Sequence, residues 1–577
     1  MKKKIQRRDL FKAAFATGGL AFAGNLGIPL GVKSVSASVP TSDYKAMVCV
    51  FLQGGNDSLN MLVPFANSHY HDARYSSRAE SNLAVKDTEL TIPDVLHDGT
   101  KLVNPYRIDG SVDGFEGPIE EAYLLKGVYK PGGLTNSSLS NEQEALGVNA
   151  VMPELARLIE DKKASVIQNV GTLVRPLDPG TNYKTFNDLE KLTNLPTFLF
   201  AHNQRKVLHT GVANNPKTSG WAGRIADLWD VNPTNSPLNP PFGLNISYWP
   251  GSYHLLRGDK TSPTLLSRNG PTNYEGMDYN YAKGDTKANQ TNMRRRALFQ
   301  ALAGKKNVTM NNVTSELKDT LANNYYSTDD AWRGFYGGLL QTSEDVISDL
   351  SVKWSNVSTD EFFSRKDPYG NPLFHDYLTD YETFELSEKP PQTLNKQLSA
   401  VARMIHLGKN SYQFNRQIFY VCLGGFDTHG NQNKNHPSKL RALSLSLWNF
   451  QMALEEMGLA NNVTTFTMSD FGRTLTNNGD GTDHAWGASH IVMGGDGNNT
   501  SGNLVGGKLF GTFPDLAMDG GTLDYSMGKG RYVPTTSQDQ VNAAICQWFG
   551  VPTNDIESKL FPNLTNFGEK YLSLFAS

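Results

Sequence analysis

RQIFYVCLG at residues 416–424 and VTTFTMS at residues 463–469 are the two stretches that decide the fold of this chain. Each is a short apolar run rich in β-branched and aromatic residues, which is typical of a buried strand. Between them, apolar residues recur at spacings of three and four, the pattern of one helix face. These residues are Leu440, Leu443, Leu447, Phe450, Leu454 and Met457. We expect a helix that begins just after Pro437, ends at Gly458, and joins two parallel strands by a right-handed crossover.

Other runs predict further parts of the same sheet and its helices. AMVCVFLQ at residues 46–53 is almost continuously apolar, as expected of a central strand that is covered on both faces. Residues 164–170 also have the character of a strand, and residues 153–163 before them have helical periodicity. A second helical stripe covers residues 394–405. The alternation of strands and helices predicts an α/β fold.

Two long polar segments are expected to be insertions. Residues 77–147 are punctuated by glycine, and residues 245–390 alternate helical pieces with stretches rich in Gly, Asn and Tyr, so we interpret the second segment as a mostly helical cap. The chain has 577 residues, of which 38% are hydrophobic, and only three isolated cysteines. It therefore has enough apolar material for a large core, and it has no cysteine pattern for a disulfide framework or an iron–sulfur cluster.

The first 37 residues resemble an export signal. QRRDLFK at residues 6–12 matches the twin-arginine pattern, and an apolar stretch rich in Gly and Ala at residues 13–32 precedes a small-residue cleavage site that ends at Ala37. We therefore expect export by the twin-arginine machinery and a periplasmic or secreted protein. A retained N-terminal anchor is the alternative.

Removal of this signal would make the chain more acidic. It takes away seven basic residues and one acid, which changes the net charge from −3 to −9. A chain of this charge without a basic stripe is not expected to bind nucleic acid. No later stretch is long and apolar enough to predict a transmembrane segment in the mature chain.

Acidic and imidazole side chains follow the ends of the predicted strands. Parallel strands end at one edge of a sheet, where open α/β folds bind ligands, so these side chains are expected to converge. The candidate ligands are Asp57, Asp427, His429, Asp470, His484 and His490. Carboxylates and neutral imidazoles suit one or two divalent ions such as zinc, manganese or calcium. Two such ions could hold the attacking and leaving oxygens of a phosphoryl or sulfuryl ester.

Each candidate also has a structural interpretation. Asp57 could stabilise the turn in which it lies, and Asp427 and Asp470 could cap the helices that follow them. His484 or His490 could be a hydrogen-bonded core histidine. The metal-site interpretation is favoured because all of these residues follow predicted strands.

Several blocks of the sequence together resemble one known family. They are FLQGGNDSLNMLVPF from residue 51, SGWAGRIADL from residue 219, GGFDTHGNQ from residue 424, SDFGRT from residue 469 and GTDHAWGASHIVMGG from residue 481. With the exported start, they are similar to the bacterial domain of unknown function 1501 family over most of the mature chain. The resemblance implies an alkaline-phosphatase-like and sulfatase-like domain over residues 44–577. Its expected architecture is a three-layer α/β/α sandwich with a largely parallel central sheet and the two insertions.

The resemblance also assigns metal ligands by position. The implied ligands are Asp57, Asp427, Asp470, His484 and, as an alternative to His484, His490. His429 departs from the superfamily pattern because it follows the aspartate by two positions rather than four. Phe471 stands where the superfamily has a histidine, so one metal site is expected to be weakened, lost or completed by the late histidine.

The hydroxyl nucleophile of the superfamily has no clear counterpart here. Relatives resemble Arg-Ser-His-Phe at this point, whereas residues 172–181 read TLVRPLDPGT. By position, Thr181 is the best candidate, with Thr172 and Ser58 as alternatives. None of the cysteines lies in a CxPxR-like setting, which argues against a formylglycine-type sulfatase.

Three basic residues are candidate contacts to the ester oxygens: His202, Arg224 and Arg473. For the two arginines, ion pairs at the surface or between layers are the alternative.

Three functions are consistent with these patterns. The first is an exported metal-dependent hydrolase that acts on phosphate or sulfate esters of small molecules or polysaccharides. The second is a non-catalytic exported binding or scaffold protein that keeps the fold. The third, a twin-arginine redox enzyme, is disfavoured because cofactor cysteines and a GxGxxG after a strand are absent from the sequence.

Overall fold

The computed structural model describes most of the chain after residue 42. The described residues are 43–78, 82–92, 127–135, 144–229, 244–249, 253–271, 346–347, 349–357, 363–367, 371–375, 393–518, 524–525 and 528–577. The expected export signal lies outside them, as do large parts of the two expected insertions. Among the described helices, none has the length and apolar character needed to cross a membrane.

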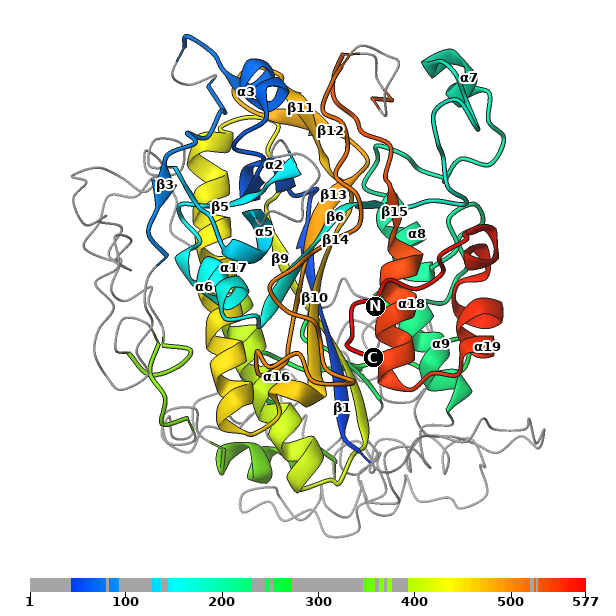
Figure 1. Ribbon diagram of the computed structural model, residues 1–577. Helices are drawn as coiled ribbons and strands as arrows, with labels where there is room; N and C mark the ends of the chain where they lie inside the picture. Colours follow the sequence, from blue (N-terminus) through cyan, green and yellow to red (C-terminus); the bar gives the residue numbers. More distant parts are fainter. Residues whose placement is uncertain are drawn as a thin grey trace, which may run out of the picture.

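A nine-stranded sheet forms the centre of the molecule (Figure 1). Its order is β14-β6-β13-β10-β1-β9-β7-β8, and β15 also pairs with β6. The strands are β1 (Lys45–Gln53), β6 (Ala164–Gly171), β7 (Asn245–Ser247), β8 (Thr264–Leu265), β9 (Arg416–Gly424), β10 (Val463–Ser469), β13 (Ala488–Met493), β14 (Leu509–Phe510) and β15 (Thr536–Ser537). Because β7 and β8 belong to this sheet, the described beginning of segment 245–390 is part of the sheet itself.

The three strands that were predicted most directly lie at the middle of the sheet. β1 pairs in parallel with β10 on one side and with β9 on the other, so Cys49 lies opposite both Phe466 and Tyr420. β9 and β10 have the predicted bounds and are parallel to each other through β1. β1, the first strand among the described residues, thus lies between two strands that are linked by a helix crossover.

The crossover helix α17 (Gln432–Glu456) is longer than predicted. It begins before Pro437 instead of after it, because the amides of Lys434 and Asn435 already bond to the carbonyl of Asn431. Proline removes a single backbone bond, which a helix of this length and burial tolerates. The helix ends at Glu456, and Gly458, whose φ is +65°, closes it as expected.

The sheet is mixed, and this corrects the expectation of a largely parallel one. β13 runs antiparallel to both of its neighbours, β10 and β6. The connection from β10 to β13 contains a hairpin, β11 (Arg473–Asn477) and β12 (Thr482–His484), in place of a crossover helix. Without a crossover the chain returns in the opposite direction.

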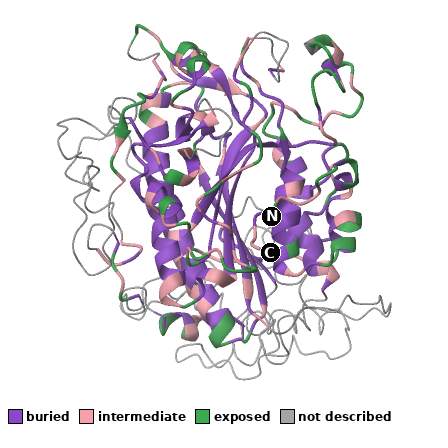
Figure 2. Cartoon of the chain, viewed as in Figure 1, coloured by how far each residue is buried: buried purple, intermediate pink, exposed green. Residues whose placement is uncertain are grey.

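Helices cover both faces of the sheet (Figure 1). α6 (Pro153–Glu160), α16 (Thr393–Asn410) and α17 lie on one face, and α8 (Gln204–Thr210), α9 (Trp221–Leu228) and α18 (Gln538–Phe549) lie on the other. Alternate residues of β1 therefore enter different cores: Val48 and Val50 pack with α16 and α17, whereas Cys49 and Phe51 pack with α9 and α18. Figure 2 shows that burial is continuous from the sheet to the inner sides of both layers. A run that is apolar at every position is what such a two-sided strand requires.

A smaller sheet and several short elements lie outside the central sheet and its two helical layers. The second sheet has the order β2-β5-β4-β3. These and the remaining elements are α2 (Ser58–Met61), β2 (Leu62–Val63), α3 (Ser68–Arg74), β3 (Glu89–Leu90), β4 (Val128–Tyr129), α5 (Gly132–Thr135), β5 (Gly147–Asn149), α7 (Phe186–Glu190), α11 (Tyr253–Leu256), η6 (Ala460–Asn462), α19 (Thr553–Asp555), η7 (Ile556–Leu560) and η8 (Pro562–Asn566).

Candidate metal centre

Three loops meet at the carboxyl edge of the sheet. β10, β1 and β9 are parallel neighbours, so the residues that follow them emerge side by side. Gly54 has a φ of +119°, and a Cβ atom there would lie 2.4 Å from the backbone nitrogen of Asp427. Gly55 has a φ of +87°, and a Cβ atom there would lie 2.3 Å from the ring of Phe471. The two glycines therefore let the three loops come together.

Asp427, His429 and His484 form an open group at this edge. The first two come from the loop after β9, and His484 is the last residue of β12. Nε2 of His429 lies 2.9 Å from Nε2 of His484, and these nitrogens lie 3.2 and 3.1 Å from Oδ1 of Asp427. We call these three residues, together with His202, the outer cluster. The Asp427 side chain is 41% exposed, so solvent reaches the group.

Hydrogen bonds on the far side of each imidazole determine which nitrogen faces the cluster. Nδ1 of His484 donates to the carbonyl oxygen of Phe200 at 2.7 Å. Nδ1 of His429 lies 3.3 Å from Oδ1 of Asp483. A carbonyl and a carboxylate only accept, so a neutral imidazole in either place carries its proton on Nδ1. Both Nε2 lone pairs then face Asp427, which is the usual arrangement behind histidine ligands.

Three lone pairs therefore converge on one point. At separations of 2.9 to 3.2 Å they repel one another unless a proton or a cation lies between them. A divalent ion with bonds of about 2.0–2.2 Å spaces neighbouring ligand atoms about 2.8–3.1 Å apart in octahedral geometry and about 3.3–3.6 Å apart in tetrahedral geometry, and the observed triangle is close to the octahedral spacing. Two imidazoles and one carboxylate on one side of an ion leave its remaining positions open. These residues fit a single divalent ion.

His202 lies beside this triangle. Its Nε2 is 3.3 Å from Oδ2 of Asp427, the carboxylate oxygen that the other two histidines do not contact. Its ring packs edge to face against His484, with centroids 4.8 Å apart. The ligand atoms of these three residues lie within 4.8 Å of one another. His202 can therefore act as a further ligand or as a hydrogen-bond partner for a bound molecule.

Arg473 holds Asp427 in place. Its fully buried guanidinium donates to Oδ1 of Asp427 at 2.6 Å and to the carbonyls of Gly55, Thr482 and Phe426 at 2.9, 2.9 and 3.1 Å. Burial raises the pKa of Asp427, but the charge and the hydrogen bond of Arg473 outweigh burial and hold this pKa below its ordinary value. Asp427 stays ionised, and the donors of Arg473 are used within the protein. Arg473 is thus a positioning residue.

Asp57 has a different partner. Its side chain is fully buried, and its oxygens accept hydrogen bonds from Nη1 and Nη2 of Arg74 at 2.6 and 3.1 Å. Gln432 donates to the same carboxylate at 2.5 Å. Nearby, the ring of His436 lies 2.9 Å from Oδ1 of Asn56. We call these five residues the inner layer.

The charges of the inner layer are already balanced. Burial raises the pKa of Asp57, but the charge and hydrogen bonds of Arg74 lower it more, so the net shift is below the ordinary value. Burial lowers the pKa of His436 to about 3, so this imidazole is neutral at pH 7. A guanidinium therefore compensates Asp57, the position at which the resemblance implies a metal ligand.

Asp470 forms no described hydrogen bond with the triangle, although the charges of His202 and Asp427 act on it. Its Oδ2 accepts from the backbone N–H of Gly54 at 2.6 Å, and its Oδ1 is buried without a hydrogen-bond partner among the described residues. Burial raises the pKa of Asp470 above its ordinary value. Phe471 follows it, and its ring packs on His484 at 4.2 Å and on His202 at 5.2 Å. Phe471, which stands where the resemblance implies a histidine, thus packs against two imidazoles of the outer cluster.

The other candidates have contacts elsewhere. His490 lies within β13, buried opposite Ile167. Thr172 accepts a hydrogen bond from Gln204 at 2.9 Å, and Ser58 accepts one from the backbone of Ser489 at 2.9 Å. None of these three forms a described hydrogen bond to the outer cluster.

Thr181 and Arg224 also have other surroundings. Thr181 is exposed in the loop after β6, where its backbone N–H bonds to the carbonyl of Asp178. Arg224 is buried and donates to four carbonyls, including those of Thr210 and Lys559 at 2.6 and 2.9 Å. It therefore joins chain segments and makes no described contact with the site.

Three functional contacts were missed from the sequence. Asp483 precedes His484 directly, and its acidity beside a candidate ligand could have suggested an orienting role. Phe200 acts through its backbone carbonyl, which no side-chain pattern predicts. Arg74 is the last residue of a short helix, and its sequence neighbourhood gives no sign that it pairs with Asp57.

One family profile matches part of the chain. A family described as Protein of unknown function (DUF1501) matches residues 378–522. This segment runs from before α16 to beyond β14 and contains Asp427, His429 and His484, but it does not include β1 or His202. The match supports the resemblance noted from the sequence. No curated protein matches the chain.

Proposed function

We propose that this protein is an exported metal-dependent hydrolase of phosphate or sulfate esters with one divalent ion at the outer cluster. The observation that supports this most directly is the triangle of Asp427 Oδ1 with Nε2 of His429 and His484. Each imidazole is oriented by an acceptor of its Nδ1–H group, the carbonyl of Phe200 or the carboxylate of Asp483. An alkaline-phosphatase-like arrangement belongs to the same proposal. Helical layers on both faces of the sheet and ligands at its carboxyl edge are consistent with it.

One ion is favoured over two. A second ion would need Asp57 and Asp470, the other two aspartates at this edge. Asp57 is already paired with Arg74 in a buried bidentate contact, and the position after Asp470 holds a phenylalanine ring instead of an imidazole. Replacement of a buried ion by a guanidinium keeps the charge balance without a metal.

The chemistry follows from what each residue contacts. A divalent ion supplies Lewis-acid polarisation of an ester oxygen and activation of water. Arg473 keeps Asp427 ionised and fixed, and His202 presents an imidazole beside the open positions. The three predicted hydroxyls make no described contact with the outer cluster, so we propose water as the attacking group.

Metal binding is the first test. The mature protein, treated with a chelator and then dialysed, is titrated with zinc and with manganese by calorimetry, and the metal content is measured by elemental mass spectrometry. We expect one ion per chain. Asp427→Asn and His484→Gln should abolish this binding, whereas His69→Gln, a change of an exposed histidine outside both groups, serves as the matched control.

Turnover is the second test. 4-Nitrophenyl phosphate and 4-nitrophenyl sulfate are offered to the loaded protein, and hydrolysis should disappear in Asp427→Asn but persist in His69→Gln. A protein that takes up no zinc, manganese or calcium contradicts the metal centre. Binding of one ion without hydrolysis of either ester contradicts the hydrolase assignment alone.

A non-catalytic binding protein is the second candidate. It is favoured by the pairing of Asp57 with Arg74, which argues against a second ion. It is also favoured because the predicted hydroxyls make no described contact with the outer cluster. Metal-dependent retention of a sulfated or phosphorylated polysaccharide without its cleavage would support this candidate. Loss of ester hydrolysis on Asp427→Asn would exclude it.

Export by the twin-arginine pathway is also part of the proposal. Changing Arg7 and Arg8 together to Lys should leave the full chain in the cytoplasm, as measured by cell fractionation with an antibody. Export that is unaffected by this change would contradict the proposal.

A further inference from the structure

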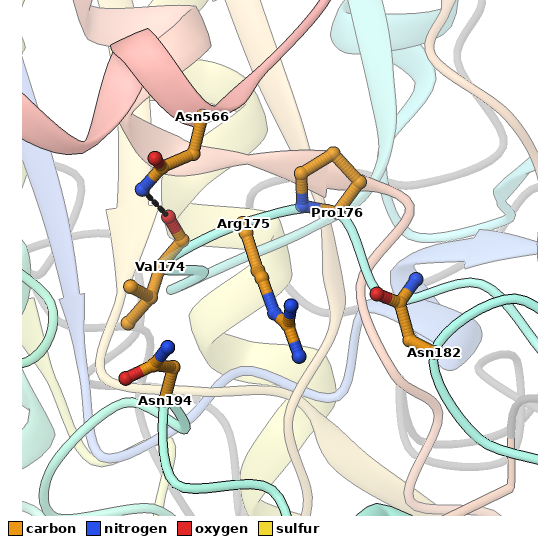
Figure 3. Close-up of a pocket in the computed structure, with 6 residues that line it drawn as sticks. All are labelled: Val174, Arg175, Pro176, Asn182, Asn194 and Asn566. Carbon is orange, nitrogen blue, oxygen red and sulfur yellow. Dashed lines mark hydrogen bonds between the residues drawn. The ribbon is translucent and has the colours of Figure 1, made fainter.

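A separate pocket lies beside the loop that follows β6. It has a volume of about 420 Å³, within the range of small-molecule sites. Its lining residues are Val174, Arg175, Pro176, Asn182, Asn194 and Asn566 (Figure 3). None of them belongs to the outer cluster or the inner layer. The loop is the segment in which the resemblance places the hydroxyl nucleophile, and the proposed metal centre does not use the side chains of Arg175, Asn182 and Asn194.

The walls of the pocket are held by a small core of their own. Leu173, Leu177, Trp486 and Phe567 are buried in one apolar cluster under these loops. Nδ2 of Asn566 donates to the carbonyl of Val174 at 2.9 Å, which ties the C-terminal segment to the loop (Figure 3). The pocket is thus built between segments that are fixed to each other, and ligand binding there would not have to order a free loop.

Arg175 is the only charged residue among the described residues that line the pocket. Figure 3 shows its guanidinium directed into the pocket between Asn182 and Asn194. Its Nε is buried without a hydrogen-bond partner, and no described acid forms an ion pair with it. Asp178, the acid nearest in sequence, is exposed. Nε itself is covered by the protein, so the donors that a bound anion would meet are the Nη groups at the end of the side chain, whose charge has no described counter-charge.

The donor set defines the ligand. A guanidinium presents its N–H groups as a planar fork that matches the two oxygens of a carboxylate, sulfate or phosphate group. Asn182 and Asn194 add amide groups, which both donate and accept and so suit hydroxyl groups next to the anion. Val174 and Pro176 add apolar surface.

We propose that this pocket binds the oxyanion of a small hydroxylated molecule, with Arg175 as its anchor. The anion is a carboxylate, a sulfate or a phosphate, and the hydroxyl groups around it contact the asparagine amides. The site is distinct from the metal centre, and the proposal does not depend on a bound ion.

Calorimetric titration of the mature protein in the presence of a chelator tests this proposal. The probes are inorganic sulfate, inorganic phosphate, glucuronate and, as the neutral comparison, glucose, all at one ionic strength kept with sodium chloride. We expect saturable binding of glucuronate or of an inorganic oxyanion, and weaker binding of glucose. The relative affinities of sulfate, phosphate and glucuronate identify which oxyanion the pocket prefers.

Variants locate the binding. Arg175→Ala should weaken the binding at least about tenfold, and Arg175→Lys should weaken it less, because it keeps the charge but loses the fork. Arg78→Ala, a change of an exposed arginine elsewhere, is the matched control and should bind normally. Binding should also be normal in Asp427→Asn, which keeps this site separate from the metal centre.

Two results would overturn the proposal. One is binding that is equally strong in Arg175→Ala and the unmodified protein. The other is the absence of saturable binding of all three oxyanion probes up to about 20 mM. Neither result affects the metal-binding test, so the two proposals fail independently.

Discussion

Asp57 and Asp427 follow adjacent parallel strands of one sheet, but the side chain of Asp57 is completely buried whereas that of Asp427 is 41% exposed. The guanidinium of Arg74 donates two hydrogen bonds to Asp57. Asp427 faces the imidazoles of His429 and His484 at distances that fit a divalent ion between them. The comparison separates two uses of a carboxylate at a strand end. Asp57 is part of the buried core and is paired with the cation of Arg74. Asp427 is held in position by Arg473 and is accessible to solvent.

The largest expected effect is on the inner layer. Arg74→Met leaves the buried carboxylate of Asp57 without its cation, which should lower the free energy of unfolding by about 3–5 kcal/mol. Urea unfolding followed by circular dichroism measures this loss. The double change Asp57→Asn, Arg74→Met should recover part of it, because the uncompensated charge is then removed.

Arg78→Ala, at an exposed position, should change the free energy of unfolding by less than about 0.5 kcal/mol. A small effect of Arg74→Met, similar to that of Arg78→Ala, would contradict the division into two regions.

The second effect is a pH dependence of stability. His436 has a pKa of about 3 in the folded protein and an ordinary value near 6.5 when unfolded. Between these values the unfolded state binds a proton that the folded state does not, so acidification favours unfolding. Its contribution is about 1.4 kcal/mol per pH unit below pH 6.5. Urea unfolding at a series of pH values from 7.5 to about 4.5 measures the slope.

His436→Gln removes this titration and keeps a donor near Asn56. The variant should lose stability less steeply on acidification than the unmodified protein, while other buried histidines such as His490 contribute equally to both. His436 is surrounded by Asp57, Arg74, Lys439 and Arg473, whose charges are the same in both proteins. Parallel pH profiles for the two proteins would show that His436 does not have this role.

A smaller effect is expected behind the outer cluster. Asp483→Asn weakens the acceptor of His429 Nδ1–H, so the imidazole is held less firmly and is a poorer ligand. Loss of such an orienting partner typically weakens metal binding about 10–100-fold. Zinc titration by calorimetry measures the change, with Asp72→Asn as the exposed control. Unchanged affinity in Asp483→Asn would mean that His429 is not a ligand.

The smallest effect is expected for Asp427→Asn in metal-free protein. The guanidinium of Arg473 is buried, but the carboxylate of Asp427 is 41% exposed, so solvent screens the pair, and Arg473 keeps its bonds to backbone carbonyls. Stability should therefore fall by only about 1–2 kcal/mol, less than for Arg74→Met. Added zinc should raise the thermal midpoint of the unmodified protein but not that of the variant. A large loss of stability in metal-free Asp427→Asn would place Asp427 in the core alongside Asp57.

The central fold could be predicted because its signals are local. β9 and β10 have apolar runs of the right length, and α17 has an apolar stripe, so their type and order follow from periodicity. The direction of β13 could not be predicted, because it depends on the hairpin β11–β12 replacing a crossover helix. The start of α17 was misjudged because proline usually marks a first turn, whereas here a single lost bond is tolerated.

The sequence predicted which strands the candidate site residues follow, but it did not predict the partners of their side chains. Topology places Asp57, Asp427 and Asp470 at one edge, and no local pattern says which of them receives a guanidinium and which receives imidazoles. That choice depends on Arg74 reaching Asp57 from a helix after the first strand. Such a pairing is a property of the assembled fold and is absent from any single stretch of sequence.

The pairing of Asp57 with Arg74 has a consequence for how folding and ion binding depend on each other. A carboxylate that is balanced by the chain itself needs no ion from the surroundings, so the buried part of this edge can fold without one. The ion proposed for the outer cluster would then bind in a separate step. Under the proposed export, the ion it first meets is set by the compartment in which the open side faces solution, and removal of that ion would empty the site without unfolding the protein.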